Sequence, residues 1–129
     1  MSSTRVGVSA LPARGYDRAR ETPPTFRRVL VVRFGRIGDL LMLTPALRAL
    51  GVAAPEAAID LLTTPIGAAT LATSPRLRAR HVLRWRRIPH RVNPEKIRLV
   101  RRLRSLALDA VFLFERAPRF HALVDALGV

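Results

Sequence analysis

Residues 28–50 read RVLVVRFGRIGDLLMLTPALRAL, and this stretch decides the fold. Its first part, 29–32, is a short apolar run rich in β-branched residues, which is typical of a strand buried on both faces. Gly35 and Gly38 follow, and glycine permits a tight turn and a close approach of the backbone to a ligand. After Gly38 the apolar residues recur at a helical period. The stretch therefore predicts a strand, a glycine turn and a helix, with Asp39 at the start of the helix.

The rest of the chain continues this alternation of strands and helices. Further strands are expected at 57–62, 80–83 and 109–114, and further helices at 66–72, 94–108 and 118–129. In the last segment an apolar stripe is formed by Phe120, Leu123, Val124 and Leu127. Such alternation predicts an α/β fold, a Rossmann-like parallel sheet with flanking helices, in which 29–32 is a central strand.

Pro45 interrupts the helical pattern, because proline inside a helix removes a hydrogen bond and clashes with the preceding turn. Two arrangements satisfy this constraint. A single helix from Gly38 can kink at Pro45, or a new helix can begin with Thr44 as its N-cap and Pro45 as its first residue. The residues alone favour neither arrangement.

The first 25 residues carry scattered charges, several prolines and no sustained period. We interpret 1–25 as a disordered leader or as the product of a wrongly assigned start codon. The remaining residues, 26–129, are expected to form one domain or part of one, since the chain has 129 residues and no internal repeat. Hydrophobic residues make up 49% of the chain, enough for a packed core, and the absence of cysteine excludes disulfide and thiolate chemistry.

The composition is strongly basic, with a formal net charge of +14 at pH 7. Such a charge implies an anionic partner, which can be nucleic acid, a phospholipid surface or a phosphorylated substrate. No uncharged apolar run reaches the ~20 residues that a membrane-spanning helix needs, and the N-terminus lacks the apolar core of a signal peptide. The sequence therefore predicts a soluble cytoplasmic protein, with peripheral contact to the inner face of the cell membrane left open.

The stretch 28–50 also resembles the opening of glycosyltransferase family 9, the lipopolysaccharide heptosyltransferase family. The resemblance is carried by 28–33 (RVLVVR), 37–39 (IGD) and 44–50 (TPALRAL), which follow in the family's order without a gap. It implies that 26–129 is part of the N-terminal, acceptor-side domain of a GT-B glycosyltransferase, in which two Rossmann-like domains face a cleft. It also favours one long helix across the proline.

The resemblance gives Asp39 a role, because the aspartate of the family's IGD motif looks like the general base that activates the acceptor hydroxyl. This implies an inverting transfer of a heptose-like sugar from a nucleotide-sugar to a lipopolysaccharide-core-like or other cell-envelope glycan, without a metal or other cofactor. Gly35, Arg36 and Gly38 belong to the same loop and are expected to contact the substrate. The residues alone also allow a simpler role, since a carboxylate at a helix start stabilises the helix by ~0.3–1 kcal/mol.

A second candidate site is the cluster of Arg84, Arg86 and Arg87 around Trp85. Family members carry a similar cluster before their long helix, where it looks like the part that holds the acidic, phosphorylated acceptor. Guanidinium groups suit this task because they donate two parallel hydrogen bonds to a carboxylate or phosphate. A solvated charged stretch is the plainer interpretation of the same residues.

Other motifs are weaker. Two residues separate Gly35 from Gly38 and no third glycine follows in place, so the dinucleotide fingerprint GxGxxG is incomplete, and the ending of a Walker loop is absent. The three histidines have no spacing that suggests a metal site. The alternatives are a small basic nucleic-acid-binding protein, which no helix-turn-helix, zinc or RNP pattern supports, and a non-catalytic interaction protein.

The chain departs from the family after the strand expected at 109–114. Members usually continue with an acidic residue and a glycine, roughly IDxxG, whereas Leu113, Phe114, Glu115 and Arg116 follow here. Glu115 stands two positions late for that acid, so the family's role is not carried over to it. The resemblance also includes nothing of the family's second domain, which holds most contacts to the donor nucleotide. We therefore expect the 129 residues alone to be inactive.

Overall fold

The apolar run of the decisive stretch forms strand β2 (Arg28–Val32) in the computed structural model, which describes residues 4–7, 25–84 and 94–129. The residues from Val29 to Val32 are almost completely buried. Val29 and Val31 belong to one hydrophobic cluster and Leu30 and Val32 to another, because alternate side chains of a strand point to opposite faces of the sheet. A strand covered on both faces needs consecutive apolar residues, as observed here.

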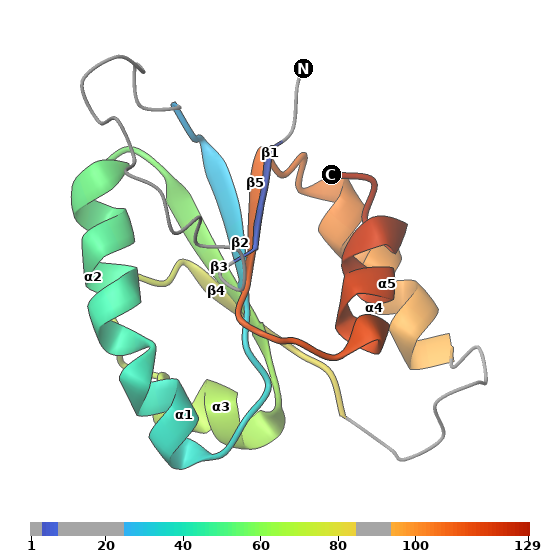
Figure 1. Ribbon diagram of the computed structural model, residues 1–129, viewed down its shortest axis with the longest axis horizontal. Coiled ribbons are helices and arrows are strands. Elements are labelled where there is room, and N and C mark those ends of the chain that lie inside the picture. The colour runs from blue at the N-terminus through green and yellow to red at the C-terminus, as the bar shows by residue number, and fades with distance from the viewer. Residues whose placement is uncertain (1–3, 8–24, 85–93) are drawn as a thin grey trace.

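Within the described ranges, five parallel strands form one sheet, and helices cover both of its faces (Figure 1). Across the sheet the strands follow the order β1 (Thr4–Gly7), β5 (Ala110–Leu113), β2, β3 (Ala58–Thr63) and β4 (Ala79–Val82). One face carries α1 (Ile37–Met42), α2 (Thr44–Ala53) and α3 (Pro65–Thr70), and the other carries α4 (Pro94–Ser105) and α5 (Pro118–Ala126). The predicted α/β fold, with a parallel sheet and 29–32 in a central strand, is confirmed.

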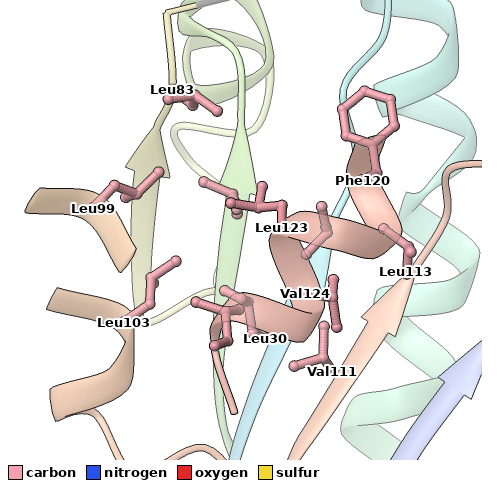
Figure 2. Packing of buried hydrophobic residues seen from close by; sticks show 12 residues of the cluster. Leu30, Leu83, Leu99, Leu103, Val111, Leu113, Phe120, Leu123 and Val124 are labelled. Carbon is pink, nitrogen blue, oxygen red and sulfur yellow. The ribbon is translucent and has the colours of Figure 1, made fainter. Parts of the chain in front are cut away.

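The two helices α4 and α5 pack on the sheet through a single apolar cluster, shown in part in Figure 2. Leu30 of β2 and Val111 of β5 supply the sheet side of this cluster, and Leu103 of α4 is completely buried in it. The stripe predicted for the last helix, Phe120, Leu123, Val124 and Leu127, lies entirely within the cluster. Its helical spacing is therefore explained by burial against the sheet.

The first residues depart from the prediction. The sequence places Thr4–Gly7 in a disordered leader, but these residues form β1 and pair in parallel with β5. β5 offers the backbone groups that β2 does not use, and an edge strand of four residues can satisfy its own backbone there. For Thr4–Gly7 the prediction of disorder is wrong, while 8–24 lies outside the described residues.

Pro45 marks the break between two helices. α1 ends at Met42 and α2 begins at Thr44, with Leu43 as the N-cap of α2. The backbone of Leu43 is itself helical, and its carbonyl accepts a hydrogen bond from the N–H of Leu47 at 3.0 Å. Pro45 thus lies in the first turn of α2, where its missing N–H would have no partner within the helix. Thr44 is not the N-cap, because the break falls one residue before it. Leu43 keeps a helical backbone and caps both helices, so the arrangement is close to the helix kinked near Pro45.

Gly67 allows α3 to lie directly on β3. A Cβ at this position would overlap Oγ1 of Thr63 and stand 3.0 Å from its Cβ, so the helix would have to move. We expect Gly67→Ala to lower the free energy of unfolding by ~1–3 kcal/mol, the usual cost of overpacking, measured as a shift of the denaturant midpoint. Gly38→Ala is the matched control, since a Cβ there meets no protein atom within 4 Å. Equal midpoints for the two variants would contradict this account.

Candidate active site

The strand order predicts where a ligand should bind. From β2 the chain proceeds through β3 to β4 on one side, and then returns to β5 on the other side of β2. The helices change face with this return, as Figure 1 shows. In open α/β sheets, ligands bind outside the carboxyl ends of the strands at such a change of direction. Here this place lies between the ends of β2 and β5.

An open cleft of about 570 Å³ occupies this place. The segments after β2 and β5 line it together with α1 and α5, and its side chains include Arg33, Asp39, Phe114, Glu115, Arg116 and Phe120. Arginines and carboxylates thus stand beside aromatic rings in one hollow. Such a lining suits a polar substrate with negative charge, because guanidinium groups bind carboxylates and phosphates while the rings exclude water.

Asp39 lies in the first turn of α1, and its side chain is 48% exposed at the cleft. Its Oδ2 accepts a hydrogen bond from the backbone N–H of Arg36 at 3.1 Å, which caps the helix. Its Oδ1 lies 3.2 Å from Nη2 of Arg33. The capping role that the residues alone suggested is therefore present. Each oxygen still has a lone pair that can accept a proton, so capping does not prevent other chemistry.

Gly35 is required by this position of Asp39. A Cβ at Gly35 would stand 2.8 Å from both Cβ and Oδ2 of Asp39, so the carboxylate itself takes the space that the missing side chain leaves. Gly38 differs, because it is exposed and a Cβ there would meet no protein atom. The fold does not need a glycine at position 38. A close approach of substrate to Gly38 stays a prediction.

Glu115 lies beside the arginine that contacts Asp39. The Glu115 side chain is 14% exposed, and its Oε1 accepts a hydrogen bond from the backbone N–H of Phe34 at 2.7 Å. The same oxygen lies 3.6 Å from Nη1 of Arg33. Arg33 therefore stands between two carboxylates. Sequence reasoning missed this group because its residues come from two loops 81 positions apart.

Two further arginines of the cleft, Arg116 and Arg119, were also missed. The Arg116 side chain is exposed, and the guanidinium carbon of Arg119 lies 5.1 Å from the centroid of the Phe120 ring. Their only signal in the sequence is positive charge shortly after a predicted strand. This signal is weak in a chain with a net charge of +14.

The remaining predicted site residues are placed only in part. Arg36 is exposed in the loop between β2 and α1. Arg84 is exposed just after β4, at the same edge of the sheet as the cleft, since the described strands are all parallel. The backbone N–H of Arg84 donates to Oε1 of Glu95 at 3.2 Å. Arg86 and Arg87 lie outside the described residues, so the arginine cluster stays a prediction.

The part of the chain that the structure describes has neither a metal-binding group nor a membrane-spanning helix. It contains no group of three side chains of the types that bind metal ions. None of the helices in these described ranges combines the length and the apolar character needed to cross a membrane.

The fold is similar to that of a solved glycosyltransferase. The crystal structure of the glycosyl transferase family 9 from Veillonella parvula DSM 2008 matches this chain with a TM-score of 0.68 and 20% sequence identity. The match covers 78% of this chain and 29% of that chain, so this chain spans less than a third of that protein's length. No protein-family model matches the sequence, and no curated protein matches it. The chain is thus similar in fold to part of a family 9 glycosyltransferase, in agreement with the resemblance of residues 28–50.

Proposed function

We propose that this chain is the acceptor-side, N-terminal part of a family 9 glycosyltransferase of GT-B architecture. The complete enzyme transfers a heptose-like sugar from a nucleotide-sugar to a lipopolysaccharide-core-like or other cell-envelope glycan. It acts in the cytoplasm or at the inner face of the cell membrane. The observation that carries the proposal is Asp39, held at an arginine-lined cleft outside the carboxyl ends of β2 and β5. The fold similarity to a family 9 structure supports the reaction class.

In the proposed reaction Asp39 accepts the proton of an acceptor hydroxyl. The hydroxyl oxygen bonds to the anomeric carbon of the donor while the bond from that carbon to the phosphate oxygen breaks on the opposite side. The nucleotide diphosphate leaves with the bonding electron pair, and the configuration at the anomeric carbon is inverted. Asp39 then releases its proton to water. The step uses no metal or other cofactor.

The remaining site residues bind the acceptor in this proposal. Gly35 and Arg36 in the loop and Gly38 in the first turn of α1 lie beside the reacting hydroxyl, and the arginines of the cleft hold the carboxylates or phosphates of an acidic glycan. Arg84 extends this positive surface along the same edge of the sheet. Arg86 and Arg87, which lie outside the described residues, are proposed to bind the same acceptor. In this proposal most contacts to the donor nucleotide belong to a second domain of the complete enzyme.

The proposal predicts that the isolated 129 residues transfer no sugar. Transfer requires that donor and acceptor are held in a reactive geometry, which can supply ~7–11 kcal/mol of the barrier. The test compares the isolated chain with a mixture of the chain and a separately expressed C-terminal part of a family 9 enzyme. Calorimetry measures donor binding and mass spectrometry measures the product.

Product in the mixture alone would support the proposal. Product from the isolated chain would show that a second domain is dispensable and would contradict this prediction. Failure of both samples, together with tight binding of the chain to duplex DNA at ~0.15 M salt, where exposed charges are screened beyond ~8 Å, would favour the nucleic-acid alternative.

A smaller change in the same loop tests the geometry of the site. We expect Gly35→Ala to lower the turnover of a complete enzyme that carries this chain by about 10-fold or more, because a small misplacement of a reacting group is costly. The new methyl group must push the carboxylate of Asp39 away from its position. A denaturant midpoint close to that of the unchanged protein would locate the loss in the loop. Unchanged turnover would show that the loop accommodates the methyl group.

A further inference from the structure

We infer that Glu115 is a positioning residue, which sets the place of Asp39 through Arg33. The inference rests on the proposed role of Asp39 as general base. It assigns a task to the segment after β5, where the chain departs from the pattern of the family it resembles. In this view the base is held in place by the segment after β5 and not by α1 alone.

Several contacts join the loop after β2 to the segment after β5. Nη1 of Arg33 donates to the carbonyl oxygen of Phe114 at 2.5 Å. The backbone N–H of Phe34 donates to Oε1 of Glu115 at 2.7 Å. The Phe34 ring also stacks on the Phe120 ring of α5, with centroids 5.0 Å apart and planes 18° apart. Backbone, charge and ring contacts therefore fix the two loops against each other.

Arg33 carries this constraint to the base. Its Nη1 faces Glu115 at 3.6 Å, while its Nη2 faces Oδ1 of Asp39 at 3.2 Å. A planar guanidinium can serve both carboxylates at once because its nitrogens point in fixed, different directions. The ammonium group of a lysine is a single point charge and cannot occupy both positions. The arginine is thus a rigid spacer between the two acids.

The two carboxylates that Arg33 contacts differ in exposure, and this difference indicates which of them holds the other in place. The Glu115 side chain is 14% exposed and that of Asp39 is 48% exposed, with Arg33 at 26%. Both carboxylates accept a backbone N–H, but the bond to Glu115 is shorter, 2.7 Å against 3.1 Å for Asp39, and it joins two separate segments. The more buried Glu115 is therefore the fixed end. Both carboxylates line the cleft, and the more exposed Asp39 is the one that a substrate reaches more easily. Loss of Glu115 should therefore be felt at Asp39.

The experiment measures this transmission by NMR spectroscopy on the 129-residue chain. The variants are Glu115→Ala, Glu115→Gln and Arg33→Lys, with Glu56→Ala as the control at an exposed carboxylate in a turn. In Glu115→Ala, the amide hydrogen of Phe34 should exchange about 10-fold faster, as expected for the loss of a hydrogen bond to a charged group. The amide of Arg36, which donates to Asp39, should also exchange faster, and the carboxyl carbon of Asp39 should shift.

The other variants separate the hydrogen bond between Phe34 and Glu115 from the charge contacts of Arg33. The amide introduced by Glu115→Gln keeps an oxygen that can accept from Phe34, so this variant should preserve slow exchange at Phe34 and still shift the Asp39 signal. Arg33→Lys should do the same. If Glu115→Ala does not fold, Glu115→Gln alone decides, because it is nearly isosteric. An unchanged Asp39 signal and an unchanged Arg36 amide in both Glu115 variants would overturn the inference and leave Glu115 a merely structural residue.

Kinetics in a complete enzyme that carries this chain provide the second readout. Glu115→Ala should lower kcat by about 10–100-fold, the scale of a misplaced reacting group, with little change in the KM of donor and acceptor. Glu115→Gln should recover part of the loss. A loss of kcat that is accompanied by a lower free energy of unfolding, with no shift of the Asp39 carboxyl signal, would contradict positioning. The Asp39 signal could shift in the Glu115 variants while the Asp39→Asn enzyme keeps its turnover. This outcome would overturn the role of Asp39 as general base, and Glu115 would then have no part in catalysis through Asp39.

Discussion

Asp39→Asn is expected to lower the turnover of a complete enzyme that carries this chain by ~10²–10⁴-fold, the usual contribution of a general base. The asparagine amide has nearly the shape of the carboxylate but no basic oxygen to accept the hydroxyl proton. Its carbonyl oxygen can still accept a hydrogen bond from the N–H of Arg36, so the helix cap is preserved. The measurement is kcat at saturating donor and acceptor, with the denaturant midpoint as a check on folding.

The control for this experiment is Glu56→Gln, which removes one negative charge from an exposed turn outside the cleft. It separates the effect of the base from the effect of a change in net charge on an already basic protein. Near-normal turnover of Asp39→Asn would mean that Asp39 is only the cap of α1. In that case the resemblance of the IGD segment would concern structure and not chemistry.

The parts of the fold that follow from local patterns could be predicted from the sequence. β2 was predictable because its apolar run is short, mostly β-branched and followed by a glycine turn, which together favour a strand covered on both faces. α5 was predictable because its apolar residues recur at the helical period. β1 was not, since Thr4–Gly7 depends on the free edge of β5, which lies more than a hundred positions further along the chain.

The candidate site shows the same limit. Asp39 and Gly35 could be selected because they belong to one short segment. The reason for Gly35 could not, since only the structure shows that the side chain of Asp39 fills the space of the missing Cβ. Arg33 and Glu115 meet only because β5 lies next to β2. A strand order of this kind is not encoded in any single segment, so the bridge between the two acids could not be found from local patterns.

One charged residue stands out in the core, away from the cleft. Asp60 interrupts the apolar run of β3, and its side chain is only 3% exposed. Arg78 donates to it twice, from Nε to Oδ1 at 2.9 Å and from Nη2 to Oδ2 at 2.6 Å. His81 Nε2 lies 2.8 Å from Oδ2, and because an ionised carboxylate only accepts, this nitrogen donates. His81, which showed no metal-site spacing in the sequence, is thus a core histidine with a specific partner.

Asp60→Ala should therefore lower the free energy of unfolding by ~3 kcal/mol or more, as breaking a buried pair from one side usually does. Arg78 contributes little to this loss, since its side chain is 45% exposed and can turn to water. His81 is only 8% exposed and keeps an unpaired N–H in the core. Denaturant midpoints of Asp60→Ala, His81→Ala and the double variant measure the coupling, with exposed Glu56→Ala as control. If the Asp60–His81 pair is responsible, the double variant is less destabilised than the sum of the single ones. Strict additivity would show that the two residues stabilise the fold independently.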